Sequence, residues 1–386
     1  MRKFIGVINM RLNILIISHY FVTGESQELF NYLKNKTKLL VYFEHPFYFS
    51  EKKYSSVVIY EKSLFKKIIK IPKIMAPEFV TYLKDVLATI YFSLILRKKF
   101  NICIAADSLN CITALLLKKI RLINKVIYFS IDYSPVRFHS NILNFLYHLS
   151  DEICCYNSDY IWNTSERMKI EREKHGLLFK KYAKQIEVPN GVNFNEIQRL
   201  DFKEIKRNNV VFMGHLVESK GIELLIKTFP KVLKSVPEAK LIIIGKGPLE
   251  KDLKKIVLDL HINDYIIFKG FITDEEVLEI LTRSAIGVAP YVDDRNNLTY
   301  YSDPLKPKLY MAAGLPVIIT RVPKIANEIE KCKAGFVIDY NEKQLLNSIL
   351  KLLIDDELYL QCRNNAISLA SKYDWNRIFT IALNTK

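Results

Sequence analysis

Short uninterrupted apolar runs constrain the fold of this chain more than any other feature of its sequence. Each run has the length of a β-strand, ends at glycine or at polar residues, and precedes a segment with the apolar spacing of an amphipathic helix. The clearest runs are residues 12–17, 101–106, 125–130, 210–213, 241–244, 286–289 and 317–320. Strands without polar alternation are buried on both faces, so the pattern predicts parallel sheets covered by helices on both sides.

The alternation of strand and helix occurs in both halves of the 386 residues, and a chain of this length can form two domains. We predict an α/β fold with two doubly wound, Rossmann-like domains whose parallel sheets face each other across a cleft. Residues 1–195 form the first domain and residues 196–365 the second, while residues 1–9 are expected to be weakly structured. In sheets of this type, ligands bind beyond the carboxyl ends of the strands.

Residues 61–73 combine bulky apolar side chains with Lys66, Lys67, Lys70 and Lys73. Two interpretations of this segment are open. A basic amphipathic segment can lie on an anionic membrane surface. The same pattern also fits an ordinary surface helix with a half-buried apolar face.

Three further segments give less regular predictions. Residues 79–96 are strongly apolar but are interrupted by two charged residues, so we expect a buried helix rather than a membrane span. A short strand is predicted at residues 153–156 and a helix at residues 158–168. Pro230 lies inside an amphipathic pattern and predicts a kink or a break in that helix.

The charge of the chain is uneven. The formal net charge is +16, and residues 1–190 hold 29 Lys and Arg against 16 Asp and Glu, which leaves +13 there and +3 in the rest. We therefore expect the first half to meet an anionic surface. The six cysteines show no metal-ligand spacing, which is typical of reduced thiols in a cytosolic protein.

Residues 210–220 form a candidate anion site. A strand that stops at Gly214 leads through a polar loop to a helix opened by Lys220 and Gly221. Backbone N–H groups and the positive helix end meet at such a turn, and His215 offers a further nitrogen. A common strand–loop–helix unit with a solvated lysine is the alternative interpretation.

Other strand ends extend this set. Lys306 can flank a diphosphate together with Lys220, while Gly245, Gly247 and Gly270 allow the backbone to approach a base or a sugar. The first half contributes Gly24 and Ser26 on the acceptor side, and Asp132 just beyond the end of a strand. The sequence has no P-loop, zincin or nucleophile-elbow motif.

The order of motifs in the second half resembles the nucleotide-sugar domain of glycosyltransferase family 4, which has the GT-B fold. The residues that carry this resemblance are 188–192, 212–215, 219–221, 241–249, 268–270, 285–290, 303–306, 310–317 and 327–329. The first half resembles the family only in outline. Residues 373–375 resemble the closing segment of the family, so residues 366–386 are expected to form a helix that crosses back to the first domain.

The resemblance implies transfer of a sugar from a nucleotide-diphosphate-sugar donor, usually with retention and without a bound metal or other cofactor. Lys220 corresponds to the diphosphate lysine of the family, and His215 stands where an arginine is usual. The paired glutamates of the family fall on Tyr301 and Leu309, so Asp303 is the candidate that replaces the ribose contact. The donor side also includes Gly214, Phe271, Ser302, Leu305 and Lys306.

We therefore predict a glycosyltransferase that acts on a glycan or a lipid-linked acceptor in the cytoplasm, at the inner face of the membrane. Lys220 and His215 would stabilise the departing diphosphate, and Asp132 would polarise or deprotonate the acceptor hydroxyl. Two alternatives remain open: a nucleotide-sugar epimerase and a non-catalytic sugar-nucleotide-binding subunit. A nucleic-acid partner is not expected, because the basic and aromatic residues form no recognised module.

Overall fold

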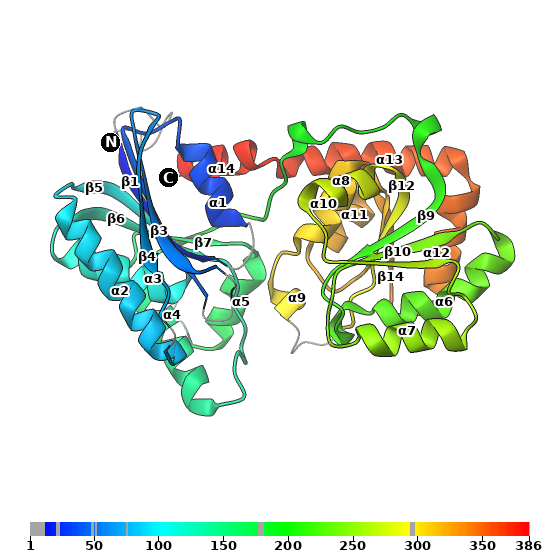
Figure 1. Cartoon of the computed structure of the whole chain (residues 1–386), viewed down its shortest axis with the longest axis horizontal. Helices are drawn as coiled ribbons and strands as arrows, with labels where there is room; N and C mark the ends of the chain where they lie inside the picture. The colour runs from blue at the N-terminus through cyan, green and yellow to red at the C-terminus, as the bar shows by residue number, and fades with distance from the viewer. Residues whose placement is uncertain are drawn as a thin grey trace. The chain divides into compact units, whose positions relative to one another are not determined.

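The computed structural model of the chain describes residues 12–20, 24–47, 50, 52–74, 76–176, 181–293 and 298–385. The chain divides into two units (Figure 1). The first unit comprises residues 1–189 together with residues 375–386, and the second unit comprises residues 190–374. Each unit is built around its own sheet and its own apolar core.

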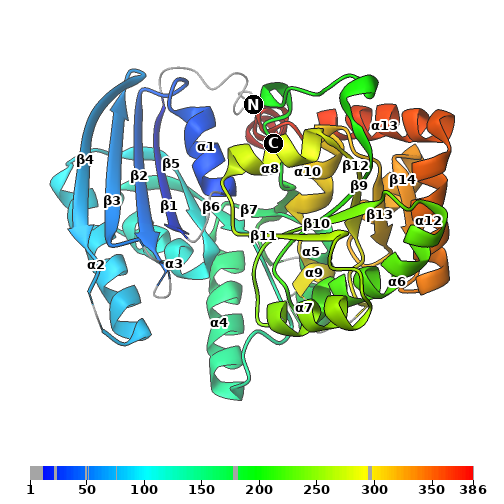
Figure 2. The same cartoon turned by 45° about the vertical axis from the view of Figure 1, so that its right-hand side comes forward.

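The sheet of the first unit has the strand order β4-β3-β2-β1-β5-β6-β7-β8. The strands are β1 (Asn13–Tyr20), β2 (Leu39–Pro46), β3 (Tyr54–Glu61), β4 (Leu64–Pro72), β5 (Phe100–Ala106), β6 (Ile123–Ser130), β7 (Tyr160–Asn163) and β8 (Lys184–Glu187). The neighbouring strands β2, β1, β5, β6, β7 and β8 pair in parallel, as predicted. Strand β3, by contrast, pairs antiparallel with both β2 and β4. Figure 2 shows these strands side by side at the edge of the sheet.

Residues 64–72 are the edge strand β4 of this sheet, so the surface helix that was one interpretation of residues 61–73 is not present. Ile69 and Ile71 pack against the core, whereas Lys66, Lys67 and Lys70 are exposed. The β-branched residues favour a strand. Lysines on an edge strand also discourage pairing with the edge of another molecule.

The helices of the first unit are α1 (Glu25–Leu33), α2 (Glu78–Ile95), α3 (Asp107–Lys119), α4 (Asn141–Asn157), α5 (Glu166–Lys174) and α14 (Trp375–Asn384). The strand predicted at residues 153–156 is wrong, because these residues are the last turn of α4. Residues 158–168 hold β7 and the start of α5 rather than one helix. A short apolar run does not distinguish strand from helix by its period alone.

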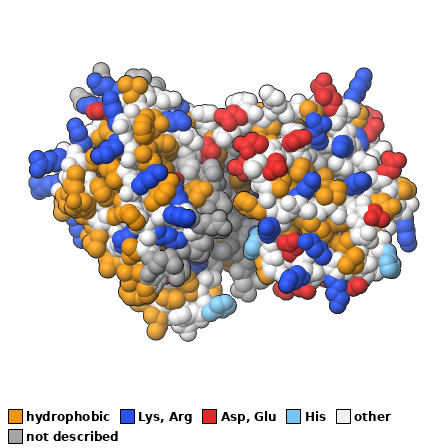
Figure 3. Space-filling model, viewed as in Figure 1, with side chains coloured by type: hydrophobic (Ala, Val, Ile, Leu, Met, Phe, Trp, Pro, Cys, Tyr) orange, Lys and Arg blue, Asp and Glu red, His pale blue; other side chains and the backbone are white. Residues whose placement is uncertain are grey.

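Helix α2 is present where it was predicted, but it is not buried as predicted. Its buried residues are Thr81, Asp85, Thr89 and Ser93, and large apolar side chains lie on its outer face. Figure 3 shows hydrophobic side chains gathered on the first unit, over the region where Figure 1 places α2. Within the described residues, no helix has both the length and the apolar content needed to cross a bilayer.

The sheet of the second unit is entirely parallel, as predicted, with the order β11-β10-β9-β12-β13-β14. Its strands are β9 (Lys206–Met213), β10 (Lys240–Ile244), β11 (Ile266–Gly270), β12 (Ser284–Ala289), β13 (Val317–Thr320) and β14 (Gly335–Ile338). Figure 1 shows α6 (Ile222–Ser235) and α7 (Glu250–Asp259) on one side of this sheet, and α8 (Asp274–Thr282) and α10 (Leu305–Ala313) on the other.

The remaining helices of the second unit are α9 (Leu298–Tyr301), α11 (Ile325–Cys332), α12 (Glu342–Ile354) and α13 (Asp356–Ala370). Helix α6 continues through Pro230, so this proline does not break it. The buried side of α6 packs into a core that also includes β9, β10 and β12. The carboxyl ends of β9, β10 and β12 therefore open onto one edge of a well-packed scaffold.

Candidate active site

The turn between β9 and α6 holds Lys220 in a fixed place. Gly221 caps α6 with a φ of +67°, and a Cβ atom there would lie 1.8 Å from the carbonyl oxygen of Pro290. Only glycine fits this position without a shift of the backbone. The backbone N–H of Val292 also donates to the carbonyl of Ser219 at 3.1 Å. The turn is thereby attached to the loop that follows β12.

The ammonium group of Lys220 lies in a largely buried, positively charged environment. Its Nζ donates to Oγ1 of Thr299 at 2.7 Å and lies 5.2 Å from the centroid of the Tyr291 ring. Burial, together with the charge of Lys306, lowers the pKa of Lys220 from 10.5 to about 8. An anion bound between two lysines would reverse this effect, because it favours the charged form of both. Lys306 is therefore near enough to Lys220 to affect its charge, and the binding of a diphosphate between the two lysines stays a prediction.

The glycines at the ends of β9 and β10 have a packing role. Gly245 has a φ of +126°, and a Cβ atom there would lie 2.0 Å from the carbonyl oxygen of Gly214. A Cβ atom at Gly247 would lie 2.4 Å from the carbonyl oxygen of Leu216. Gly245 also donates its N–H to Gly270 at 2.8 Å. These glycines let neighbouring loops pack backbone against backbone, and their contact with a donor stays a prediction.

The other residues predicted on the donor side differ in exposure. His215 and Phe271 are exposed beyond the ends of β9 and β11, and Phe271 is 78% exposed. Tyr301, which replaces the first glutamate of the resemblance, is buried. Three further residues predicted on the donor side are half-buried. Ser302 precedes α10, and Leu305 and Leu309 lie within it.

Asp303 belongs to a buried ion pair that the sequence analysis missed. Its carboxylate pairs with the ammonium of Lys308, a fully buried residue, and accepts the backbone N–H of Asn190 at 2.6 Å. Lys308 also donates to the carbonyl of Asn190 at 2.7 Å and lies 4.0 Å from the Tyr373 ring centroid. Asp303 therefore fixes the segment at Asn190 to α10. The available sequence signal was the position of Lys308 between apolar residues of a mostly apolar helix.

The residues predicted in the first unit do not form one cluster. Asp132 is paired with Arg137, whose Nη1 lies 2.7 Å from Oδ2, and this carboxylate raises the pKa of Arg137 against the opposing effect of burial. Gly24 caps α1 and donates its N–H to Oε1 of Gln27 at 3.0 Å. Ser26 is buried in the first turn of that helix.

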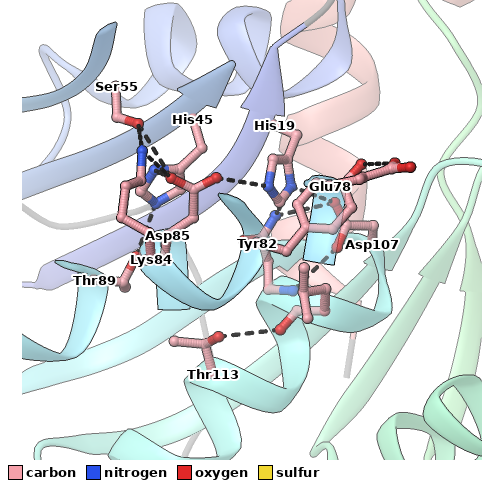
Figure 4. A network of polar contacts seen from close by, with 12 residues as sticks. His19, His45, Ser55, Glu78, Tyr82, Lys84, Asp85, Thr89, Asp107 and Thr113 are labelled. Carbon is pink, nitrogen blue, oxygen red and sulfur yellow. Dashed lines mark hydrogen bonds and ion pairs between the residues drawn. The ribbon is translucent and has the colours of Figure 1, made fainter. Parts of the chain in front are cut away.

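A polar network that the sequence analysis did not identify lies at the carboxyl ends of β1 and β5, which are neighbours in the sheet (Figure 4). His19 is the residue before the last of β1, and its Nδ1 lies 3.1 Å from Oδ2 of Asp107, the first residue of α3. Asn110 donates to the same oxygen at 3.0 Å. Both His19 and Asp107 directly follow predicted strands, and that position was the available signal.

The network continues inward to α2. Asp85 lies between two imidazoles, with Oδ2 at 3.7 Å from Nε2 of His19 and Oδ1 at 3.2 Å from Nδ1 of His45. Lys84 Nζ lies 2.7 Å from Oδ1 of Asp85, and Thr89 Oγ1 lies 2.8 Å from Nε2 of His45. Among the described residues, no group of three or more His, Cys, Asp or Glu is placed to hold a metal ion.

These contacts set the charges of the network. Burial opposes the charge on His19, but Asp107 and Asp85 outweigh it and raise its pKa to about 9. Burial likewise opposes the charge on Asp85, yet its bonds with His19 and His45 keep its pKa well below the usual value. Burial lowers the pKa of His45. His19 is therefore an imidazolium held between two carboxylates near neutral pH.

Asp107 is the member of this network that reaches solvent. Its side chain is 37% exposed, whereas those of His19 and Asp85 are each 2% exposed. Its backbone has a φ of +64°, which is uncommon for a residue with a side chain and is often found at functional sites. The fold thus holds a carboxylate at the carboxyl edge of the sheet, with a buried imidazolium behind it.

Residues 194–369 match the family model of glycosyl transferases group 1. This match lies within the second unit of the chain. Among its curated relatives is the alpha-monoglucosyldiacylglycerol synthase of Streptococcus pneumoniae, 26% identical over 183 residues, with 43% of this chain and 39% of that protein covered. Another is the sulfoquinovosyl transferase SQD2 of Arabidopsis thaliana, 26% identical over 186 residues, with 47% of this chain and 34% of that protein covered.

These matches span less than half the length of either relative. Solved structures of low identity extend the likeness in fold over nearly the whole chain. Sucrose-phosphate synthase from Thermosynechococcus elongatus has a TM-score of 0.71 at 16% identity, covering 95% of this chain and 96% of its own. Anabaena HepE in complex with UDP has a TM-score of 0.68 at 14% identity, covering 97% of each chain. The predicted GT-B fold is confirmed.

Replacement of Lys308 by methionine should destabilise the second unit strongly. It leaves the Asp303 carboxylate without its buried partner, and breaking a buried ion pair from one side costs about 3–5 kcal/mol. Chemical unfolding followed by circular dichroism measures this change. The matched control is Lys254→Met on α7, where the lysine pairs with Glu250 at the surface and little change is expected. Equal effects of both substitutions would contradict a structural role for Lys308.

Proposed function

We propose that this chain is a glycosyltransferase that moves a sugar from a nucleotide-diphosphate-sugar donor to a glycan or a lipid-linked acceptor, with retention of configuration. The observation that carries the proposal is Lys220, half-buried before the N-terminus of α6 and within the charge field of Lys306, in the segment that matches the group 1 family model. Two relatives are named as a glycolipid synthase and a sulfoquinovosyl transferase, and a structural neighbour was solved with UDP. We therefore take a UDP-sugar as the first donor to test.

On the donor side, Lys220 and Lys306 would neutralise the diphosphate, and the N-terminus of α6 would add its partial positive charge. Charge builds on the diphosphate as the bond to the sugar breaks, so cations held in place stabilise the transition state more than the ground state. His215, exposed beside the same turn, would contact the outer phosphate oxygens. In this proposal the two lysine ammonium groups supply the positive charge that a metal ion would otherwise provide at the diphosphate, and no metal is required.

On the acceptor side, two carboxylates are candidates for the group that orients the attacking hydroxyl. Asp132 is paired with Arg137, which competes for its oxygens. Asp107 is held by His19 and Asn110 and is partly exposed at the end of β5. An acceptor hydroxyl that donates a hydrogen bond to Asp107 would become more nucleophilic. Asp107 would take up this proton as the new bond to the sugar forms, and would then release it to the departing diphosphate or to solvent.

Substitution of Lys220 by alanine should abolish the donor response. Ligand binding at about 100 times Kd stabilises the wild type by about 2.7 kcal/mol, which a thermal-shift panel of nucleoside diphosphates and their sugars detects. The control is Lys227→Ala, one turn into α6, where the lysine pairs with Glu223 at the surface. A Lys220→Ala variant that keeps the response of the wild type would remove the proposed donor site.

Donor binding should take up a proton near pH 8. Lys220 is only partly protonated there, because its pKa is lowered to about 8, and a bound diphosphate raises that pKa. Calorimetry with UDP-glucose in buffers of different ionisation enthalpy measures the uptake. The diphosphate of this donor is esterified at both ends and has no proton of its own to exchange. Affinity should fall as the pH rises above 8, and binding without uptake at pH 8 would argue against this role of Lys220.

Asp107→Asn should lower kcat by about 10²- to 10⁴-fold, the usual range for loss of a group that acts on a reacting proton. Release of UDP from UDP-sugars, with diacylglycerol vesicles or soluble glycans as acceptors, measures the rate. The thermal response to the donor should be unchanged. Asp132→Asn is the matched comparison, and a large loss there with none at Asp107 would assign the acceptor role to Asp132.

The same assays distinguish the alternatives. An epimerase would convert the donor sugar when incubated without acceptor. A non-catalytic subunit would respond to the donor in the thermal-shift panel but release no UDP with any acceptor. Sugar transfer that depends on an acceptor excludes both.

A further inference from the structure

Helix α2 presents its apolar face to solvent and buries its polar face, which is the reverse of an ordinary surface helix. Its outer face carries large apolar side chains, with exposed fractions of 72% for Phe79, 55% for Leu83, 57% for Leu87 and 60% for Tyr91. These positions recur every four residues and form one continuous stripe. An open groove of about 410 Å³ runs along this helix, lined by Val80, Leu83, Lys84, Leu87, Ala88, Tyr91 and Phe92.

The inner face explains the inversion. Thr81, Asp85, Thr89 and Ser93 also recur every four residues, and they face the sheet. Asp85 and Thr89 are needed there because they contact His19 and His45 in the polar network. The network fixes the rotation of α2 about its axis, so the apolar stripe is directed outward. Exposed apolar surface of this extent marks an interaction site.

The charge around the stripe indicates what covers it. Residues 62–99 contain nine Lys and Arg and only two acids, Glu78 and the buried Asp85. The exposed lysines of β4 precede α2 in the sequence, and the exposed residues 97–99, Arg-Lys-Lys, follow it closely. An apolar stripe flanked by basic residues is typical of a helix that lies in the interface of an anionic bilayer.

A second copy of this chain fits the surface less well. Each copy would bring the same basic residues to the contact, and a net charge of +16 opposes association with itself. Leu64, Phe65 and Ile68 on β4 are exposed as well, so apolar and basic residues also lie together on the edge strand. This mixture suits acyl chains and anionic headgroups at the same time.

We propose that the outer face of α2, together with Lys66 and Lys67 of β4, docks on an anionic lipid bilayer with the helix parallel to the membrane plane. The inner face of the same helix contacts His19, which holds Asp107. A docked α2 would therefore place the candidate acceptor carboxylate near the bilayer surface, where a lipid-linked acceptor is presented. This inference rests on the proposed function only for the identity of that acceptor.

Vesicle co-sedimentation tests the docking. The full chain is mixed with vesicles of phosphatidylcholine alone, or of phosphatidylcholine and phosphatidylglycerol in equal parts. The wild type should sediment with the anionic vesicles and be released by salt. Leu87→Glu with Tyr91→Glu should weaken binding by about tenfold or more, since it places two acids in the apolar stripe. Lys66→Gln with Lys67→Gln should weaken binding to anionic vesicles only.

The matched control is Leu258→Glu on α7 of the second unit, where the leucine is 61% exposed, close to the 57% of Leu87. This control should bind vesicles as the wild type does. All variants should keep the circular dichroism spectrum and the unfolding transition of the wild type, which shows that they are folded. They should also keep the thermal response to the donor, which separates docking from donor binding. The proposal is overturned if the wild type stays in the supernatant, or if Leu87→Glu with Tyr91→Glu binds as tightly as the wild type. It is also overturned if size-exclusion chromatography shows a dimer that this variant abolishes.

Discussion

The carboxylate of Asp85 determines more of the first unit than any other single group. A buried anion is costly unless it is paired, and the costs are several kcal/mol per ion. Asp85 meets this requirement through His19 and His45, which end the adjacent strands β1 and β2. That pairing holds α2 in one rotation against the sheet. The polar side of the helix is therefore inside, and its apolar side remains on the surface.

The same pairing with Asp85 helps to keep His19 positively charged at the carboxyl edge of the sheet. His19 remains protonated because carboxylates lie on both sides of it, and so Asp107 is held by a cation from behind. A carboxylate that is held in this way keeps a fixed orientation while one of its sides stays open to solvent. The strained backbone at Asp107 is consistent with this arrangement, because the surrounding contacts must stabilise a conformation that a free chain rarely adopts.

The second unit uses other means to position its charged group. The loops after β9 and β10 pack through glycines, and the turn at Gly221 leaves no room for a side chain. The buried Lys308 and Asp303 join the start of the unit to α10, which also carries Lys306. Lys220 therefore stands on a rigid turn, close enough to Lys306 for its pKa to respond. An ammonium that is already desolvated gains more from a bound phosphate than one in bulk water does.

The sequence predicted those features that depend on local pattern. Continuous apolar strands identified both sheets, and the strand–loop–helix pattern at Lys220 identified the turn that is proposed to bind the donor, because such a turn follows from local backbone geometry. The rotation of α2 could not be predicted, because an apolar stripe and a polar stripe are both present and only tertiary pairing with two distant histidines decides which is inside. The pairing of Lys308 with Asp303 was equally hidden, since a buried lysine looks like a surface lysine until its partner is known. The features that could not be predicted from the sequence are therefore the buried charged pairs, because the two partners are distant in the chain and meet only in the folded structure.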